Sequence, residues 1–314
     1  MTIAWRFVDI CLVPLALAAA VVNVAVSRWP WRLPICMSVF DRLGVYPVRH
    51  HYYTPLTYPS DLRAPLDQER VIFGLDLNAE GQLALVAKFN YRDELLAVPR
   101  KPGALVFGYD NPYFGAGDAE FLYNMVRHFK PKRIVEIGSG QSTLMAQLAV
   151  RANRSADARY RCEQICVDPF EQPWLEQAGV TVHRSRIEDL PPSAVEVLEA
   201  GDILFIDSSH VIRPQGDVLH EYLSLLGRLR PGVVIHCHDI FTPRDYPAQW
   251  VLRNRWLWNE QYLLEAFLCF NREFRVIAAV NWLWHNHREA LRDACPILFD
   301  KGGEPGSFWF VRAA

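Results

Sequence analysis

The chain has 314 residues, a length that suits one large domain or one domain with an appendage. Its formal net charge of −2 gives no electrostatic basis for binding nucleic acid, and a hydrophobic content of 51% is typical of a globular protein. The seven cysteines are scattered without a CxxC pair, which argues against a disulfide framework and a zinc site and fits a reducing compartment.

The N-terminal segment is apolar. Residues 10–26, ICLVPLALAAAVVNVAV, carry no charge. As a helix they would span roughly 26 Å, slightly less than a hydrocarbon core. Residues that favour a membrane interface flank the segment: Trp5, Arg6, Arg28, Trp29, Trp31, Arg32 and Arg42. Because more arginines follow it than precede it, we predict that residues 1–30 are a membrane anchor with the remaining chain in the cytoplasm. A cleaved signal peptide and a buried helix are the alternatives.

Residues 31–116 are rich in Pro, Tyr, Arg and His and show little periodicity, apart from a possible helix over residues 78–89. We interpret this region as an irregular accessory segment that packs on the main domain.

A regular alternation of strands and helices begins at residue 117. The helices are expected over residues 117–131, 142–152, 169–179 and 217–229. The seven strands are expected over residues 133–138, 163–168, 180–185, 202–207, 233–238, 274–280 and 307–313. This alternation predicts a Rossmann-like, doubly wound and mostly parallel α/β sheet over residues 117–314.

The first strand ends in a glycine turn, EIGSGQST. Gly138 and Gly140 let the backbone turn sharply and approach a ligand closely. Such a turn alone is weak support for a function, because it could also hold a dinucleotide pyrophosphate. A dinucleotide fingerprint, however, needs Gly or Ala at the sixth position, where Thr143 stands, and gains nothing from the carboxylate of Glu136.

The order and spacing of the motifs over residues 117–314 resemble the class I S-adenosylmethionine-dependent methyltransferases, whose first motif reads acid-x-Gly-x-Gly. The resemblance implies that the glycine turn holds the methionine part of the cofactor. An acid ending the second strand would hold the ribose, and residues after the third strand would meet the adenine. The acid in FIDSSH would lie beside the reactive methyl. The residues that inherit these cofactor-binding roles are Glu136, Gly138, Ser139, Gly140, Ser142, Thr143, Asp168, Ile187, Glu188 and Asp207.

The fifth strand ends in the unusual run HCHD. Some small-molecule O-methyltransferases, with sugar-modifying and cephalosporin-hydroxylase-like relatives, bind Mg²⁺ with an acid after strand four and an adjacent pair after strand five. This resemblance implies a metal at Asp207, His238 and Asp239, either Mg²⁺ or another divalent metal that accepts imidazole. A metal-free pocket with His238 as general base, and an inert strand end, remain open. His210 is a further candidate base, so the candidate catalytic residues are Asp207, His210 and His238, while His236 is interpreted as structural.

We predict methyl transfer to a hydroxyl of a saccharide or other polar small molecule. Loops rich in Trp, Tyr, Asn and Arg are expected to bind this acceptor, with Glu260 as a candidate substrate contact. A membrane anchor and a polar aromatic pocket together fit a glycan acceptor at the cytoplasmic face of a bacterial inner membrane. The alternatives are an NAD(P)-dependent oxidoreductase and a catalytically silent, membrane-tethered cofactor-binding protein.

Overall fold

The protein is represented by a computed structural model that describes residues 3–170 and 172–313. The chain divides into two compact units. One contains the residues up to Ala64 together with Ala248–Leu257. The other contains Pro65–Pro247 and the chain from Trp258 onward, and it carries the sheet.

The N-terminal unit contains helices α1 (Ile3–Arg28) and α2 (Pro34–Leu43). Helix α1 covers the predicted anchor, whose first two residues lie outside the described residues. It is long and apolar enough to cross a membrane, a criterion that a signal sequence or a core helix of a soluble protein also meets. Proline in the first turn and Gly44 in the left-handed conformation bound α2.

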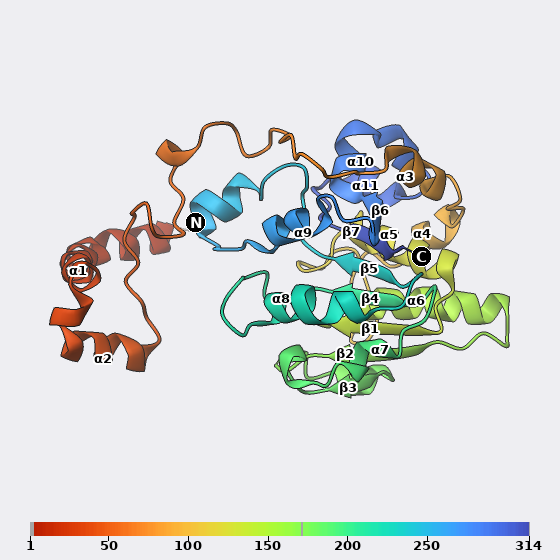
Figure 1. The fold of residues 1–314 in the computed structure, drawn as a ribbon, viewed down its shortest axis with the longest axis horizontal. Helices are drawn as coiled ribbons and strands as arrows, with labels where there is room; N and C mark the ends of the chain where they lie inside the picture. Colours follow the sequence, from red (N-terminus) through yellow and green to blue (C-terminus); the bar gives the residue numbers. More distant parts are fainter. Residues whose placement is uncertain (1–2, 171, 314) are drawn as a thin grey trace. The chain divides into compact units, whose positions relative to one another are not determined.

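The second unit is built on one seven-stranded sheet with the order β3-β2-β1-β4-β5-β7-β6 (Figure 1). The first five strands of this order are parallel, and β7 runs antiparallel to both β5 and β6. The strand bounds are β1 Arg133–Ile137, β2 Glu163–Val167, β3 Thr181–His183, β4 Ile203–Ile206, β5 Val234–Cys237, β6 Phe274–Ala279 and β7 Phe308–Arg312. The seven predicted strands and the mostly parallel sheet are therefore confirmed.

Alternate residues of the central strands face the two hydrophobic layers of the unit. Ile134 belongs to the layer that includes residues of α5 and α6, whereas the adjacent Val135 belongs to the layer that includes residues of α8 and α9. Burial on both faces explains why these strands are continuous apolar runs. The helices of this unit are α3 Ala79–Val86, α4 Arg92–Leu96, α5 Asp118–Phe129, α6 Gln141–Ala156, α7 Ser193–Glu196, α8 Asp217–His220, α9 Glu260–Leu268, α10 Val280–Asn286 and α11 Pro296–Lys301.

The accessory segment is more ordered than its composition indicated. The helix expected over residues 78–89 is present as α3, and α2 and α4 add two short helices to the segment. Polar side chains join α3 to the edge strand β6, because Asn78 Nδ2 donates to Val276 O at 2.8 Å and Gln82 Oε1 accepts from Ala279 N at 2.7 Å.

Two predicted helices differ in detail. The segment 217–229 is helical, but α8 continues into a π-helical turn over Glu221–Leu225 and a 3₁₀ turn over Leu226–Arg228. Within the segment 169–179, residue 171 lies outside the described residues, and the structure has only a 3₁₀ turn over Leu175–Ala178. Pro173 disfavours a continuous helix there because it removes a backbone donor.

Candidate active site

The glycine turn lies where the strand order reverses, between β1 and β4, at the carboxyl ends of these parallel strands. Gly138 has φ +76°, and a Cβ at this position would stand 1.8 Å from the backbone oxygen of Asp207. The close approach of the two chain segments therefore requires glycine. Asp207 N donates to Ile137 O at 2.8 Å, which fixes the end of β4 against the turn.

Glu136 stabilises the glycine turn through hydrogen bonds to the start of α6. Its side chain is buried, with Oε1 accepting from Ser142 Oγ at 2.5 Å and Oε2 accepting from Thr143 Oγ1 at 2.7 Å. Thr143 Oγ1 also accepts from Gly140 N at 3.0 Å, which caps the start of α6. Burial raises the pKa of Glu136 to about 7, against the hydrogen bonds from Ser142 and Thr143.

Asp168 ties the second strand to the same turn. Its Oδ2 accepts from Ser139 N at 3.0 Å and its Oδ1 accepts from Phe170 N at 3.1 Å. The hydroxyl of Ser139 is buried beside this turn.

A cavity of about 400 Å³ opens beside these strand ends. Its lining residues are Ile137, Gly138, Val167, Asp168, Pro169, Phe170, Arg186, Ile187, Glu188, Asp207, Ser208, Ser209, Arg213 and Asp217. Five of the predicted cofactor-binding residues are among them: Gly138, Asp168, Ile187, Glu188 and Asp207. The other predicted residues (Glu136, Ser139, Gly140, Ser142 and Thr143) are not in this lining. Glu136, Ser142 and Thr143 instead hold the turn in shape.

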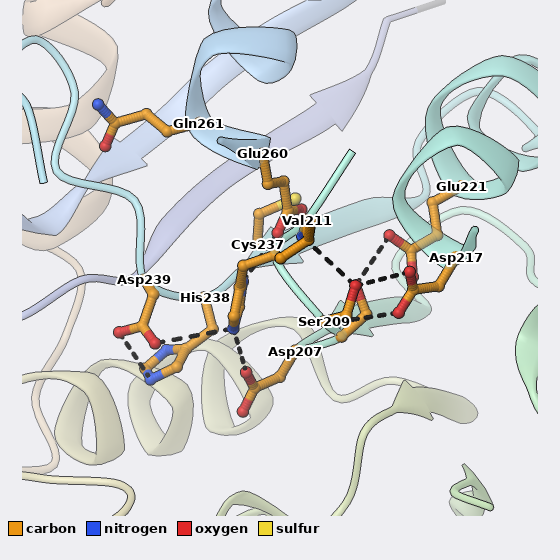
Figure 2. Close-up of polar contacts among 12 residues, drawn as sticks. Asp207, Ser209, Val211, Asp217, Glu221, Cys237, His238, Asp239, Glu260 and Gln261 are labelled. Atoms are coloured by element: carbon orange, nitrogen blue, oxygen red, sulfur yellow. Dashed lines mark hydrogen bonds and ion pairs between the residues drawn. The ribbon is translucent and has the colours of Figure 1, made fainter. Parts of the chain in front are cut away.

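Sequence reasoning missed the loop after β4 as part of the lining. Ser209 N and Oγ donate to the two carboxylate oxygens of Asp217 at 2.9 and 2.7 Å, which folds the loop back onto α8 (Figure 2). Arg213 lies within this loop and also lines the cavity. The only sequence signal was the position of these polar residues shortly after the FIDSSH motif.

Three side chains converge at the ends of β4 and β5. One ligand atom each from Asp207, His210 and Asp239 lie within 4.8 Å of one another. His210 Nε2 is 3.2 Å from Asp207 Oδ1 and 3.7 Å from Asp239 Oδ2. His210 and Asp239 are both non-glycine residues with positive φ, at +59° and +55°. Such strained backbone often accompanies functional sites.

Charge and burial act differently on the members of this cluster. Burial opposes the charged form of His210, but its bonds to Asp207 and Glu260 outweigh burial and raise the pKa of His210 well above the ordinary value. Burial favours the neutral form of Asp207, yet the imidazoles of His238 and His210 hold its pKa below the usual range. For Asp239, burial dominates and raises the pKa.

Among the described residues, His210 rather than His238 completes the cluster with Asp207 and Asp239, and the metal-ligand role of His238 stays a prediction. His238 Nε2 lies 3.6 Å from Asp239 Oδ1, and Figure 2 shows the two side chains together, but His238 is outside the three-residue cluster. Its buried Nδ1 has no hydrogen-bond partner among the described residues. His210 has a left-handed backbone, with φ +59°, and its Nε2 lies 3.2 Å from Asp207 Oδ1. His236 is fully buried and stacks on Phe205 with ring centroids 4.0 Å apart, in agreement with a structural role.

Glu260 corrects another expectation. It is only 1% exposed, so it cannot be the substrate contact that its aromatic surroundings indicated. Its Oε2 lies 2.8 Å from His210 Nδ1 and its Oε1 accepts from Tyr222 Oη at 3.0 Å. The start of α9 therefore contributes a carboxylate to the back of the histidine, a contact that no local motif signalled.

Parts of the chain are similar to known proteins. Residues 135–240 match the model of a family described as a methyltransferase domain. An uncharacterized protein of Archaeoglobus fulgidus is 25% identical over 156 residues, which cover 47% of this chain and 69% of that protein. A crystal structure of a candidate methyltransferase from Thermobifida fusca is 13% identical with a TM-score of 0.40, covering 63% of this chain and 81% of that one. The matched residues hold the glycine turn, the acid ending β2 and the cluster after β4 and β5, so this part of the chain is similar to a methyltransferase domain and resembles the class I S-adenosylmethionine-dependent methyltransferases.

Proposed function

We propose that the protein transfers the methyl group of S-adenosylmethionine to a hydroxyl of a saccharide or other polar small molecule. The observation that carries the proposal is the cavity at the switch in strand order, which is lined by Gly138, Asp168 and Asp207 and opens beside the acid–histidine cluster. A cofactor site and a group of acids and bases thus share one edge of the sheet, as a transfer reaction requires.

Each lining residue has a distinct part in holding the cofactor. The bare backbone at Gly138 permits close approach, and the carboxylate of Asp168 suits the ribose hydroxyls. Ile187 offers an apolar face to the adenine, with Glu188 beside it. Bound S-adenosylmethionine supplies an electrophilic methyl group, and the chain then has to orient the acceptor and exclude water.

A divalent cation fits the cluster of Asp207, His210 and Asp239. Two carboxylates and one imidazole approach one another there, and the Nδ1 of His210 already meets the buried carboxylate of Glu260, an arrangement common behind metal-binding histidines. The oxygen ligands suit Mg²⁺, whereas the imidazole also admits Mn²⁺ or Fe²⁺. Such a cation would lower the pKa of an acceptor hydroxyl.

Without a cation, a basic side chain of the protein can deprotonate the acceptor hydroxyl instead. His238 Nε2 lies 3.6 Å from Asp239 Oδ1, and its buried Nδ1 has no hydrogen-bond partner among the described residues. In its neutral form, the imidazole of His238 can take the proton from an acceptor hydroxyl during transfer. The carboxylates beside His210 raise its pKa and favour the charged form, which cannot accept a second proton.

The N-terminal unit supports this acceptor class. An apolar helix with a membrane-spanning length, ending at Arg28 and followed by Trp29 and Trp31, would hold the catalytic unit at the cytoplasmic face of a bacterial inner membrane. Glycans and lipid-linked saccharides are polar hydroxyl-rich acceptors found at such a surface.

Calorimetric titration of the full chain in detergent micelles with S-adenosylhomocysteine tests the proposal. We expect micromolar binding that Asp168→Asn weakens at least tenfold, because the substitution removes the charge while keeping the side-chain volume. Asp189→Asn, an exposed acid just beyond Glu188, is the matched control and should bind like the unaltered protein. Absence of binding, combined with tight binding of NAD, would sink the methyltransferase proposal.

A further inference from the structure

Residues 258–260 contact both the backbone and the imidazole ring of His210. Asn259 N and Glu260 N both donate to His210 O, at 2.9 and 3.2 Å, and Asn259 Oδ1 accepts from Ile212 N at 2.6 Å. The ring of Trp258 lies over the imidazole with centroids 4.4 Å apart. With the 2.8 Å contact between Glu260 Oε2 and His210 Nδ1, three consecutive residues hold the segment from both the main chain and the side chain.

These contacts stabilise His210 in an unfavourable backbone conformation. Its φ of +59° lies in the left-handed region, which is unfavourable for a non-glycine residue. The two amides of Asn259 and Glu260 satisfy the carbonyl of His210 in this conformation. The strain is thus offset by contacts from outside the β4–β5 region.

The direction of the imidazole follows from the same contacts. Glu260 is buried and is itself fixed by the Tyr222 hydroxyl at 3.0 Å, so its carboxylate cannot swing away from Nδ1. With Nδ1 held at the back, Nε2 faces Asp207 and Asp239. Glu260 and Asp207 thus meet different nitrogens of the imidazole, Nδ1 and Nε2 respectively.

We propose that Trp258, Asn259 and Glu260 form a clamp that positions His210, with Glu260 as the positioning residue that keeps Nδ1 occupied and directs Nε2 toward Asp207 and Asp239. The inference rests on the proposed methyl transfer, because it assigns the way in which one side chain of that site is aimed. The clamp lies beyond residue 240, outside the matched methyltransferase domain. The chain therefore completes its acceptor side with an element of its own C-terminal part.

Nuclear magnetic resonance of the full chain labelled with ¹⁵N-histidine tests the clamp. We expect a downfield, slowly exchanging imidazole N–H signal that disappears in His210→Gln and therefore belongs to His210. Glu260→Gln should move this signal upfield and speed its exchange at least tenfold, because a neutral amide is a weaker acceptor than a carboxylate. Glu260→Ala should remove the signal altogether.

Glu221→Gln is the matched control. Glu221 is fully buried like Glu260, but its carboxylate accepts from Ser208 Oγ at 3.1 Å and has no recorded bond to His210. The His210 signal should remain in place in this variant. An unchanged signal in Glu260→Gln, or an equal change in Glu221→Gln, would overturn the inference.

Titration of the same samples with S-adenosylhomocysteine separates this inference from the proposed function. Residues 258–260 do not line the cofactor cavity, so Glu260→Gln should bind within threefold of the unaltered protein. If the unaltered protein fails to bind, the methyltransferase proposal falls while the signal still reports on the clamp. If Glu260→Ala does not fold, Glu260→Gln, which keeps the side-chain volume, decides the question.

Discussion

The glycine turn and the acid–histidine cluster lie at the same edge of the sheet, but they are assembled over different distances along the chain. In the turn, Glu136 bonds to Ser142 and Thr143, which are six and seven positions away. In the cluster, His210 bonds to Glu260, 50 positions away. A local motif therefore describes the first region almost completely, whereas the second depends on how α9 packs against the end of β4.

The largest effect on cofactor binding is expected at Gly138, where the glycine turn approaches Asp207 of the acid–histidine cluster. In Gly138→Ala, the new Cβ would stand 1.8 Å from the oxygen of Asp207, and the backbone φ of +76° would be strained. We expect the Kd for S-adenosylhomocysteine to rise at least about 100-fold, which corresponds to about 2.8 kcal/mol. Calorimetry measures this change. Gly227→Ala, where an added Cβ meets nothing within 4 Å, should leave binding unaltered, and equal losses in both variants would contradict the steric explanation.

The second prediction tests whether His210, which belongs to the cluster in the structure, or His238, which was predicted from sequence, contributes more to metal binding. If a cation binds, His210→Gln should weaken Mn²⁺ binding about 10- to 100-fold, while His238→Gln should change it less than about threefold. Electron paramagnetic resonance of free Mn²⁺ during titration of the full chain measures both values. Greater loss in His238→Gln would restore the sequence-based ligand set. No binding by the unaltered protein would remove the metal from the proposal.

The contrast also shows which features could be predicted from sequence. Strand positions, the parallel sheet and the turn followed from apolar periodicity and from a motif within eight residues, because neighbouring residues determine them. The place of His210 beside Asp207 and Asp239 could not be foreseen from a local motif, because its imidazole also meets Glu260, 50 positions away. The burial of Glu260 also escaped prediction, because aromatic neighbours suit a substrate pocket and a packed core equally well.

A third prediction concerns the ionisation of Glu136, the buried carboxyl group that stabilises the glycine turn. Burial raises the pKa of Glu136 from 4.5 to about 7, so the folded chain keeps a proton that the unfolded chain releases between these values. This group therefore stabilises the fold fully below pH 4.5, and the contribution is lost as the pH rises to about 7. Glu136→Gln should flatten this fall by about 2 kcal/mol between pH 5 and pH 8.

Urea denaturation of both proteins at the two pH values gives the difference in unfolding free energy. Asp118 and Glu120, whose pKa values burial also raises, to about 6 and about 7, are present in both proteins, so the comparison isolates Glu136. Parallel pH profiles for the two proteins would show that Glu136 is ionised throughout and that its hydrogen bonds outweigh its burial.

The smallest effect is expected from the far side of the clamp. Tyr222→Phe leaves Glu260 Oε1 without its hydroxyl donor, in a position where the carboxylate is buried. Bonds to charged acceptors contribute about 1.5 kcal/mol or more to stability, whereas bonds to carbonyls contribute about 1 kcal/mol. We therefore expect Tyr222→Phe to lower the free energy of unfolding more than the loss of a bond to a carbonyl does. Tyr160→Phe, which removes a 2.7 Å bond to the carbonyl of Pro131 at the opposite end of the sheet, is the matched comparison. If urea denaturation shows Tyr160→Phe to be the more destabilising variant, Glu260 does not depend on Tyr222, and the clamp is held by its main-chain bonds instead.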